Sequence, residues 1–368
     1  MKGLLRRAGA ASPLSRTIDL EDPCFSADPY AFYETLRGEG SVLHLPRHGF
    51  WIVLGYQAAK DVFASPDRFS SAPYEFIDRA LLSADPPRHA SVRRIVSCAF
   101  SGEALRRAEQ LAAEVAQKSI RARMEVVSGF ARPISRAVAA DLIGFDEEAL
   151  GAIVQVEDEA EASHAPDGFN RICEVLDALA PTAGMFARFS QDGALEADEA
   201  RSLVRLLWLA SSVTTERTLS HAILHLLEAP ALYQRLKESP QLLPSFVEEV
   251  VRLNPPENLI RRRAVAATAL AGKPIPAGAE VNICLPAANR DPVAFDAPAE
   301  LRLKRSGGSN LSFGSGIHHC VGGPMTRRVM AAALEVFLHA SQAPRLDGEL
   351  RWLHAMMVRA PRELWIST

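Results

Sequence analysis

The sequence has no long hydrophobic run, no surplus of basic residues and no paired cysteines. None of its 368 residues lies in an apolar stretch of the roughly 20 residues that a membrane-spanning helix needs, so we expect no membrane span. The net charge is −3 and no basic run occurs, which predicts that the protein has no nucleic-acid partner. The basic N-terminus contains no apolar core of signal-peptide length, and this favours a cytoplasmic location.

The five cysteines are odd in number and widely separated, and none forms a CxxC pair. They are Cys24, Cys98, Cys173, Cys284 and Cys320. This pattern supplies no disulfide framework and fits a reducing compartment. We expect four of them to be inert buried thiols, whereas the surroundings of Cys320 set it apart.

The rest of the composition is that of a globular protein, with 48% apolar and 23% charged residues. Length alone would suggest two domains. Apolar residues recur every three or four positions over much of 86–228, which predicts helices. A short strand is expected at 50–56, an extended hairpin over 267–286 with Pro-Ala-Gly as its turn, and a last long helix over about 320–339. The predicted fold class is therefore mainly α with a small β portion.

Cys320 ends the stretch FGSGIHHC, and three interpretations compete for it. The first is a buried structural thiol. The second is a zinc site with His318 and His319, but adjacent side chains do not easily converge on one tetrahedral ion and no further ligand pair is near in the sequence. The third is a single thiolate ligand to haem iron.

The haem interpretation explains the residues around the cysteine. An anionic sulfur is stabilised by backbone N–H groups at the start of a helix, and a helical pattern with an early proline follows Cys320. Gly314, Gly316 and Gly322 allow the backbone to come close to a flat ring. Phe313 can lie beside the sulfur and exclude water, which tunes the potential of an iron.

The stretch FGSGIHHCVG resembles the haem-binding loop of the cytochrome P450 family, Phe-Gly-x-Gly-x-His-x-Cys-x-Gly, at every defined position. The resemblance implies that Cys320 is the axial thiolate of haem b, iron-protoporphyrin IX. It implies that His318 hydrogen-bonds a haem propionate, that Phe313 and Gly314 line the cofactor, and that His319 takes a variable position.

Other segments are similar to the same family. Glu249 and Arg252, followed by Pro-Pro, resemble its Glu-x-x-Arg helix, although taken alone they would be an ordinary solvated ion pair. Residues 272–278 and 289–292 are also typical of it.

The family resemblance also implies which residues bind the haem propionates. By alignment with the family, the arginine is Arg262, and the segment DPPRHASVRR adds His89 and Arg93. Because His89 and Arg93 are four positions apart, they share one face of the expected helix. An arginine fork suits a carboxylate.

The resemblance covers the chain from about residue 28 to 368. It implies one domain over 28–368 with the family's triangular helical prism, in which the haem lies between a long central helix and the helix after the cysteine loop. Residues 1–27 are expected to be an N-terminal extension. The chain is shorter than usual for the family between about 74 and 84 and between about 150 and 195, so we expect an abbreviated lid over the substrate pocket.

The central helix departs from the family pattern Ala-Gly-x-Glu/Asp-Thr-Thr. The corresponding residues here are Ala210, Ser211, Ser212, Val213, Thr214 and Thr215. The alcohol is retained, but the acid that feeds protons in the family is replaced by Val213, which cannot donate one. Thr214, Thr215 and Ser211 are the predicted catalytic residues. Either water and substrate groups relay the protons, or the reaction depends less on that relay, as in oxidative coupling, desaturation or peroxide-driven oxidation.

The resemblance also implies a substrate pocket and partners. The predicted pocket walls are Leu207, Ala210, Leu259, Ile260, Met356 and Met357. For the two methionines, core packing explains the pattern equally well. The apolar character of the predicted pocket walls favours a small hydrophobic substrate such as a terpenoid, polyketide or fatty-acid-like molecule.

No reductase module follows residue 368, so we expect electrons from a separate ferredoxin or flavodoxin. This partner would be steered by arginines near the sulfur side. They are Arg88, Arg94, Arg327 and Arg328, and a solvated basic surface explains each equally well. The predicted function is a monomeric monooxygenase of secondary metabolism. The weakened relay leaves open a haem protein that binds a ligand without turnover.

Overall fold

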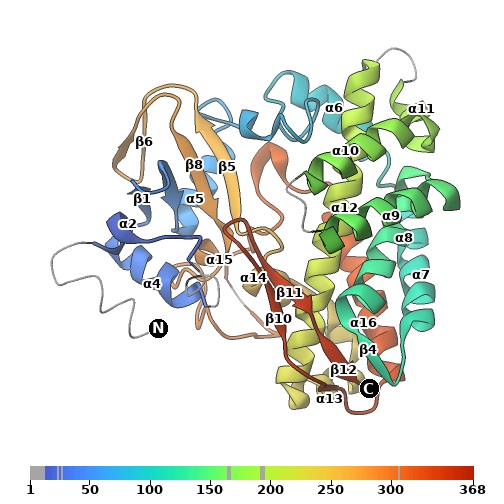
Figure 1. The fold of residues 1–368 in the computed structure, drawn as a ribbon. Coiled ribbons are helices and arrows are strands. Elements are labelled where there is room, and N and C mark those ends of the chain that lie inside the picture. The colour runs from blue at the N-terminus through green and yellow to red at the C-terminus, as the bar shows by residue number, and fades with distance from the viewer. Residues whose placement is uncertain (1–12, 23–24, 26–27, 164–166, 191–194, 306) are drawn as a thin grey trace.

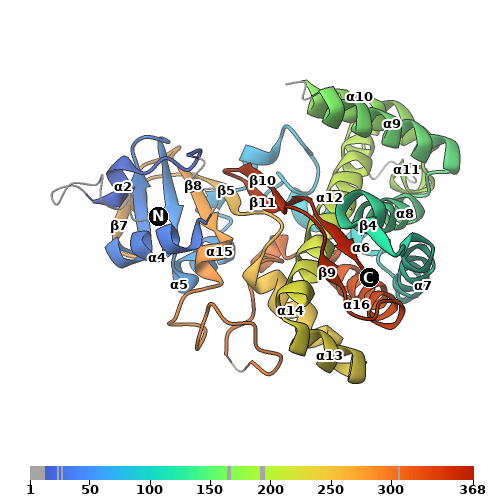
Figure 2. The ribbon, with the colours of Figure 1, turned by 60° about the horizontal axis from the view of Figure 1, so that its bottom comes forward.

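The computed structural model describes residues 13–22, 25, 28–163, 167–190, 195–305 and 307–368 (Figure 1). Helices form one half of the molecule and a mixed sheet forms most of the other half (Figures 1 and 2). The α-helices are α2 (Leu14–Thr17), α4 (Tyr30–Glu39), α5 (Tyr56–Ala64), α6 (Arg88–Ser97), α7 (Gly102–Ser119), α8 (Arg132–Ile143), α9 (Glu147–Ser163), α10 (Gly168–Leu179), α11 (Gly184–Ser190), α12 (Ala197–Glu228), α13 (Pro230–Glu238), α14 (Leu243–Leu253), α15 (Leu285–Ala288) and α16 (Gly323–Ala340). The prediction of a mainly helical chain is confirmed.

The long helix α12 runs through the helical half, and α8 and α16 pack against it (Figure 2). It begins with a capping box, in which Glu196 and Glu199 each accept a backbone N–H of the other. It ends where Pro230 starts α13, because proline disfavours helix in the residue before it. The core of this half includes Phe130 and Phe337, whose ring centroids lie 5.8 Å apart.

A five-stranded sheet with the order β1-β2-β8-β5-β3 forms the other half. The strands of the chain are β1 (Val42–Leu45), β2 (Phe50–Val53), β3 (Phe69–Ser70), β4 (Arg123–Glu125), β5 (Leu259–Ala264), β6 (Thr268–Leu270), β7 (Lys273–Ile275), β8 (Glu280–Cys284), β9 (Arg345–Leu346), β10 (Arg351–Ala355), β11 (Val358–Glu363) and β12 (Trp365–Ser367). Strand β2 pairs with β8 in parallel, and β5 pairs with β8 antiparallel. This sheet carries β5, the strand that holds Arg262, to the edge of the helical half (Figure 1).

The expected hairpin with a Pro-Ala-Gly turn is wrong. The hairpin joins β6 to β7, and its turn is formed by Ala271 (φ 47°) and Gly272 (φ 75°). A two-residue turn of this kind needs left-handed backbone at both positions, which Ala271 adopts despite its side chain. The segment 276–278 instead leads into β8, which pairs with β5 and β2.

The described residues of the expected N-terminal extension pack on the domain. Leu14, Ile18 and Leu20 are buried, and Ser15 donates a hydrogen bond to Glu39 of α4 at 2.5 Å. The boundary at residue 28 and the single domain over 28–368 stay predictions.

The cysteine prediction is partly wrong. Cys284 is buried and Cys173 is half-buried, but Cys98 is exposed because it lies on the solvent side of α6 where that helix ends. Cys24 lies outside the described residues.

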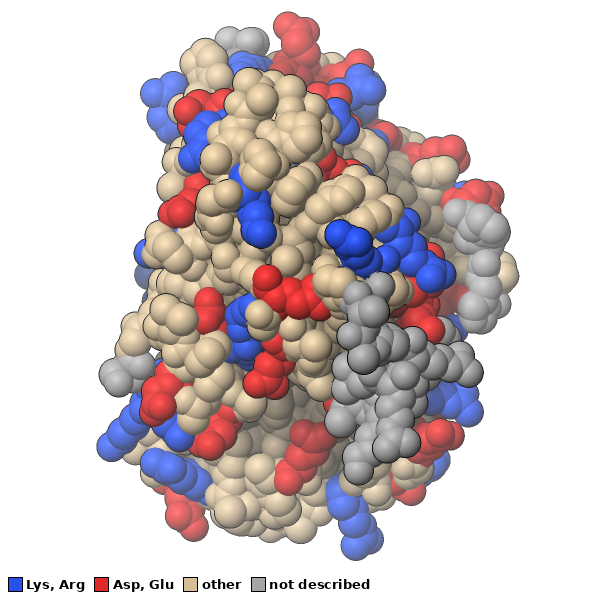
Figure 3. Space-filling view, turned by 90° about the vertical axis from the view of Figure 1, so that its left-hand side faces the viewer, with Lys and Arg blue, Asp and Glu red and all other residues tan. Residues whose placement is uncertain are grey.

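No helix in the described part of the chain is long and apolar enough to cross a bilayer. On the face that carries α2 and α4, basic and acidic side chains are interspersed (Figure 3). This mixed surface matches the balanced composition.

Candidate functional site

The loop before α16 positions Cys320. Its backbone N–H donates to the carbonyl oxygen of Phe313 at 2.7 Å, which folds the loop back on itself. Gly314 and Gly316 both have φ 69°, a left-handed conformation that residues with side chains rarely adopt. At Gly316 a side chain would also collide with the carbonyl oxygen of Phe63. The glycines are therefore required by the path of the loop.

The Cys320 sulfur lies at the N-terminus of α16. Burial raises the pKa of its thiol, and hydrogen bonds from the N–H groups of Gly322 and Gly323 oppose that rise, with smaller help from Arg93 and Arg327. The Cys320 side chain keeps accessible surface, so the protein packs against the sulfur on one side and leaves another side open. When a metal ion binds the sulfur, the thiol loses its proton. The N–H groups and the two arginines can then stabilise the resulting thiolate.

A cluster of donors lies beside this loop. The rings of His89 on α6 and His318 meet edge to face at 4.4 Å between centroids. The Nε2 atoms of both rings are buried without a hydrogen-bond partner among the described residues. Buried polar atoms of this kind are rare and point to a missing partner.

Two arginines complete this donor cluster. Arg262 is buried, and its Nη1 donates to the Arg261 carbonyl at 2.8 Å without any ion pair to a carboxylate among the described residues. Burial lowers the pKa of Arg262 and Arg93. Burial also lowers the pKa of His318 to about 3, with further lowering by Arg262 and His89. The cluster is therefore destabilised as it stands and would be stabilised by an anion with two carboxylates.

Helix α12 presents an open surface at its middle. Ala210 is exposed, although its neighbours Leu207 and Trp208 are buried. One turn later, the Thr214 hydroxyl donates to the Ala210 carbonyl at 2.6 Å, and the Ser211 hydroxyl donates to Leu207. Each hydroxyl retains lone pairs that can accept another hydrogen bond.

Glu249 and Arg252 of α14 form a buried ion pair, so the solvated alternative is wrong. The bonds are bidentate at 2.7 and 2.9 Å. Arg252 also donates to carbonyl oxygens of the loop after α15, including those of Asn289 at 3.0 Å and Pro298 at 2.6 Å. This pair braces the long loop that leads to Cys320.

Comparisons with known proteins agree with this geometry. The family model described as Cytochrome P450 matches residues 153–342. The erythromycin C-12 hydroxylase of Saccharopolyspora erythraea is 31% identical over 78% of this chain and 81% of its own length. The mycinamicin IV hydroxylase/epoxidase of Micromonospora griseorubida is 31% identical over 85% and 88%. This chain belongs to the cytochrome P450 family.

Solved P450 structures share the fold across the chain. The heme domain of a Tepidiphilus thermophilus P450 superposes with a TM-score of 0.85, covering 96% of this chain and 97% of its own at 24% identity. The enzyme CYP109E1 of Bacillus megaterium, solved with corticosterone, gives 0.83, covering 93% and 98% at 25% identity. The P450 fold predicted from the sequence is confirmed.

Members of the P450 family are monooxygenases that carry haem b with an axial cysteine thiolate. The residues of this chain fit that cofactor. Two imidazoles with buried, unpartnered Nε2 atoms match the two propionates, as do the buried Arg262 and the half-buried Arg93, neither of which pairs with a carboxylate among the described residues. The glycine turns let the loop lie close to a flat ring. A single sulfur at a helix N-terminus matches the axial ligand.

Val213 stands where most members of the family have an acid, and no neighbouring carboxylate on α12 takes over that role. Glu216 turns to α8, where it binds Arg132 at 2.8 Å. Burial raises the pKa of Glu216, and Arg132 opposes that rise. Thr215 is buried beside it. Val213 therefore leaves the Thr214 face of the helix without an acid from its own helix.

The structure scatters the predicted pocket walls. Ala210 has open surface, whereas Leu207 and Leu259 are buried in separate apolar clusters. Ile260 is half-buried, and Met356 and Met357 pack against the cluster that contains Leu259. Met357 accepts the Asn258 N–H at 2.7 Å, so the late turn does reach the start of β5. The role of all six as pocket walls stays a prediction.

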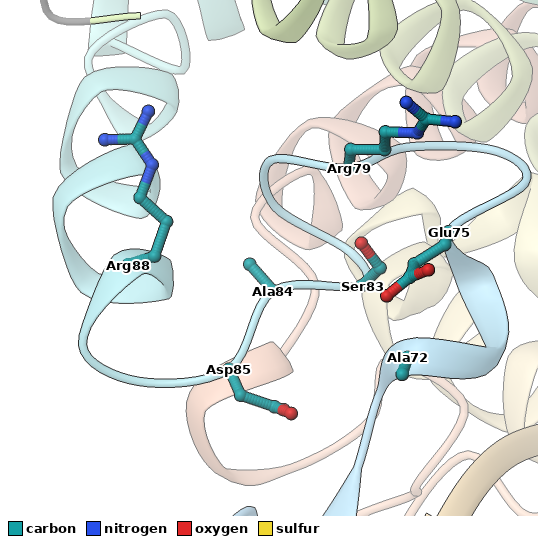
Figure 4. Close-up of a pocket in the computed structure, with 7 residues that line it drawn as sticks. All are labelled: Ala72, Glu75, Arg79, Ser83, Ala84, Asp85 and Arg88. Carbon is teal, nitrogen blue, oxygen red and sulfur yellow. The ribbon is translucent and has the colours of Figure 1, made fainter.

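A polar pocket that the sequence did not indicate lies between the 3-10 turn η1 (Ala72–Tyr74) and the start of α6, with a volume of about 520 Å³ (Figure 4). Its lining residues are Ala72, Glu75, Arg79, Ser83, Ala84, Asp85 and Arg88. None of them belongs to the donor cluster, so this pocket does not outline the cofactor site. Asp85 and Arg88 belong to the segment DPPRHASVRR, but the other lining residues carry no motif, because only the turn of the chain before α6 brings them together.

Three of the four arginines expected to steer a redox partner form ion pairs. The pairs are Arg88–Glu199 (2.5 Å), Arg327–Glu248 and Arg328–Glu109 (3.0 Å). Arg94 is exposed. Pairing neutralises part of the positive charge, and the docking role stays a prediction.

Proposed function

We propose that Cys320 binds the haem iron and that His89, Arg93, Arg262 and His318 bind the propionates. The observation that carries this proposal is the pair of buried, unpartnered Nε2 atoms beside a buried arginine that has no carboxylate. Phe313 and Gly314 line the same loop. The Arg327 guanidinium stacks 4.1 Å from the centroid of the Phe313 ring.

When bound, the haem supplies the activation of dioxygen for insertion of one oxygen atom into a substrate C–H bond. The protein contributes binding, orientation and proton handling. Hydrogen bonds from Gly322 and Gly323 temper the charge on the sulfur. The Thr214 hydroxyl, with the Ser211 hydroxyl one turn before it, holds water on the open face of α12 and passes protons along it, while Thr215 lies buried beside this face.

The substrate of this proposal is a small hydrophobic molecule of secondary metabolism, and the electrons come from a separate ferredoxin or flavodoxin to a monomeric enzyme. Two relatives, named as an erythromycin hydroxylase and a mycinamicin hydroxylase/epoxidase, support the substrate class.

A second candidate is oxidative coupling, desaturation or peroxide-driven oxidation. It is favoured by Val213 in the acid position and by the commitment of Glu216 to Arg132.

The test begins with the purified holoprotein. After reduction and addition of carbon monoxide, a haem thiolate gives a strongly red-shifted absorption band, and Cys320→Ser should abolish it. Product formation with a ferredoxin system supports monooxygenation, whereas product with peroxide alone supports the second candidate. An unchanged carbon monoxide band in Cys320→Ser would contradict the assignment of the sulfur.

A further inference from the structure

An ion pair joins α12, one turn after Thr214, to the segment before β5. Arg217 lies three residues after Thr214 and four after Val213 on α12, so it shares their helix face. Its Nη1 donates to Glu257 Oε1 at 2.6 Å and to the Pro256 carbonyl at 3.2 Å. Glu257 belongs to the segment between α14 and β5, so the pair bridges two walls of the molecule.

Glu257 also lies near the residues proposed to bind the propionates. Burial is the main cause that raises the pKa of the half-buried Tyr74. The Glu257 carboxylate adds to that rise, and the charge of Arg262 opposes it. The Tyr74 hydroxyl accepts the Arg261 N–H at 3.0 Å, which fixes Tyr74 against β5. The pair therefore lies between the Thr214 face of α12 and the strand that carries Arg262.

The pair is not saturated. Among the described residues, Glu257 Oε2 accepts no hydrogen bond, and Arg217 uses Nη1 alone for the bonds above. The Glu257 side chain is 37% exposed and that of Arg217 is 17% exposed, so both reach open space. Burial raises the pKa of the Glu257 carboxyl, and Arg217 opposes that rise. One acceptor oxygen and several N–H donors are thus presented side by side.

The chemistry of the pair selects its ligand. Its two charges cancel, so a fully charged ligand group would lose its hydration without a net opposite charge to replace it. A hydroxyl group both donates and accepts, and it can donate to Glu257 while it accepts from Arg217. On the same helix face, Val213 lies one turn and Ala210 two turns before Arg217, and both side chains are apolar.

We propose that Arg217 and Glu257 are specificity-determining residues that bind a hydroxyl group of the substrate. The substrate class is then a largely apolar skeleton that carries an alcohol at a fixed distance from the oxidised carbon. This inference rests on the proposed haem site and adds the polar anchor of its pocket.

The test uses two series of imidazole ligands on the holoprotein, 1-alkylimidazoles and 1-(ω-hydroxyalkyl)imidazoles of stepwise increasing chain length. The imidazole nitrogen binds the iron, and the chain length sets the reach of the hydroxyl group. Dissociation constants are measured from the shift of the haem absorption band. At one chain length, the hydroxyl ligand should gain about tenfold in affinity over its alkyl partner, as a hydrogen bond to charged groups provides.

The ratio of the two affinities should therefore have a maximum at one chain length. Glu257→Leu should remove this maximum, and the isosteric Glu257→Gln should weaken it. The matched control is Asp177→Asn, because Asp177 pairs with Arg205 of the same helix α12 at 2.5 Å. The side chains of Asp177 and Arg205 are 38% and 16% exposed, which is close to the exposure of Glu257 and Arg217. That variant should keep the maximum. The carbon monoxide band verifies that each variant is folded, and Glu257→Gln decides if Glu257→Leu does not fold.

A ratio of affinities that is flat with chain length in the natural protein would overturn the inference, as would a maximum that survives in Glu257→Gln and Glu257→Leu. Failure of the haem proposal has a different signature, because then no imidazole of either series shifts the absorption band.

Discussion

At the scale of single residues, the donor cluster holds buried polar groups that a dianionic ligand would satisfy. His89 and His318 bury ring nitrogens without partners, and Arg262 buries a charge without a carboxylate. Each unsatisfied group costs about 1–3 kcal/mol. Without a ligand, the protein therefore bears the free-energy cost of these unsatisfied groups. A dianionic ligand would supply hydrogen-bond acceptors and negative charge to several of them at once.

Replacing Arg262 should have opposite effects on the two forms of the protein. In Arg262→Leu the apoprotein should unfold at a higher temperature, because a desolvated charge is removed, while the holoprotein should lose haem about tenfold faster. The measurements are thermal unfolding without haem and the rate of haem transfer to an excess of a scavenging globin. Arg263→Leu is the matched control, because Arg263 is the exposed neighbour on β5. Equal haem loss in both variants would count against the propionate role.

His221 on α12 makes stability depend on pH. Burial lowers its pKa to about 3, and the charges of His225, Arg359 and Arg290 add to the effect. An unfolded histidine takes up a proton near pH 6.5, so below that pH the unfolded state binds more protons than the folded state. Its contribution to stability is therefore complete above about pH 6.5 and is lost progressively as the pH falls toward 3.

His221→Leu should flatten this dependence. In the natural protein the free energy of unfolding should fall by up to about 1.4 kcal/mol per pH unit from this group alone below pH 6.5. Denaturant unfolding between about pH 4 and 7 measures the slope. A slope that is the same in both proteins would show that another group causes the acid sensitivity.

At the scale of elements, α12 separates two kinds of chemistry on its faces. One face carries Ala210, Thr214 and Arg217 toward open space, and the other ties Glu216 to α8. Helix α12 therefore carries the Thr214 alcohol on its open face and ties its Glu216 carboxylate to α8.

Val213→Asp should restore an acid beside Thr214. If protons limit the reaction, oxygen-driven product formation should rise by up to about a hundredfold, and the share of electrons lost to peroxide should fall. Product and peroxide are measured together with a ferredoxin system. Glu216→Gln should lower stability but leave this partition unchanged, because Glu216 binds Arg132. Unchanged partition in Val213→Asp would refute the relay argument for position 213.

At the scale of the whole molecule, the sequence predicts the helices and the residues of family motifs well, but it misses one turn and the contacts between residues that carry no motif. The helices and the cysteine loop follow from periodicity and from a motif of neighbouring residues. The turn at Ala271 was missed because alanine rarely adopts left-handed backbone. The Arg217–Glu257 pair has no local signature, because its residues lie on different elements.

The parallel pairing of β2 with β8 has a consequence for synthesis of the chain. Trp51 pairs with Val281, about 230 positions later. At about 5–20 residues per second, the ribosome releases β8 on the order of ten seconds or more after β2. Until then the β2 edge of the β1–β2 hairpin lacks its partner strand, so this edge is open to pairing with other chains and to binding by chaperones.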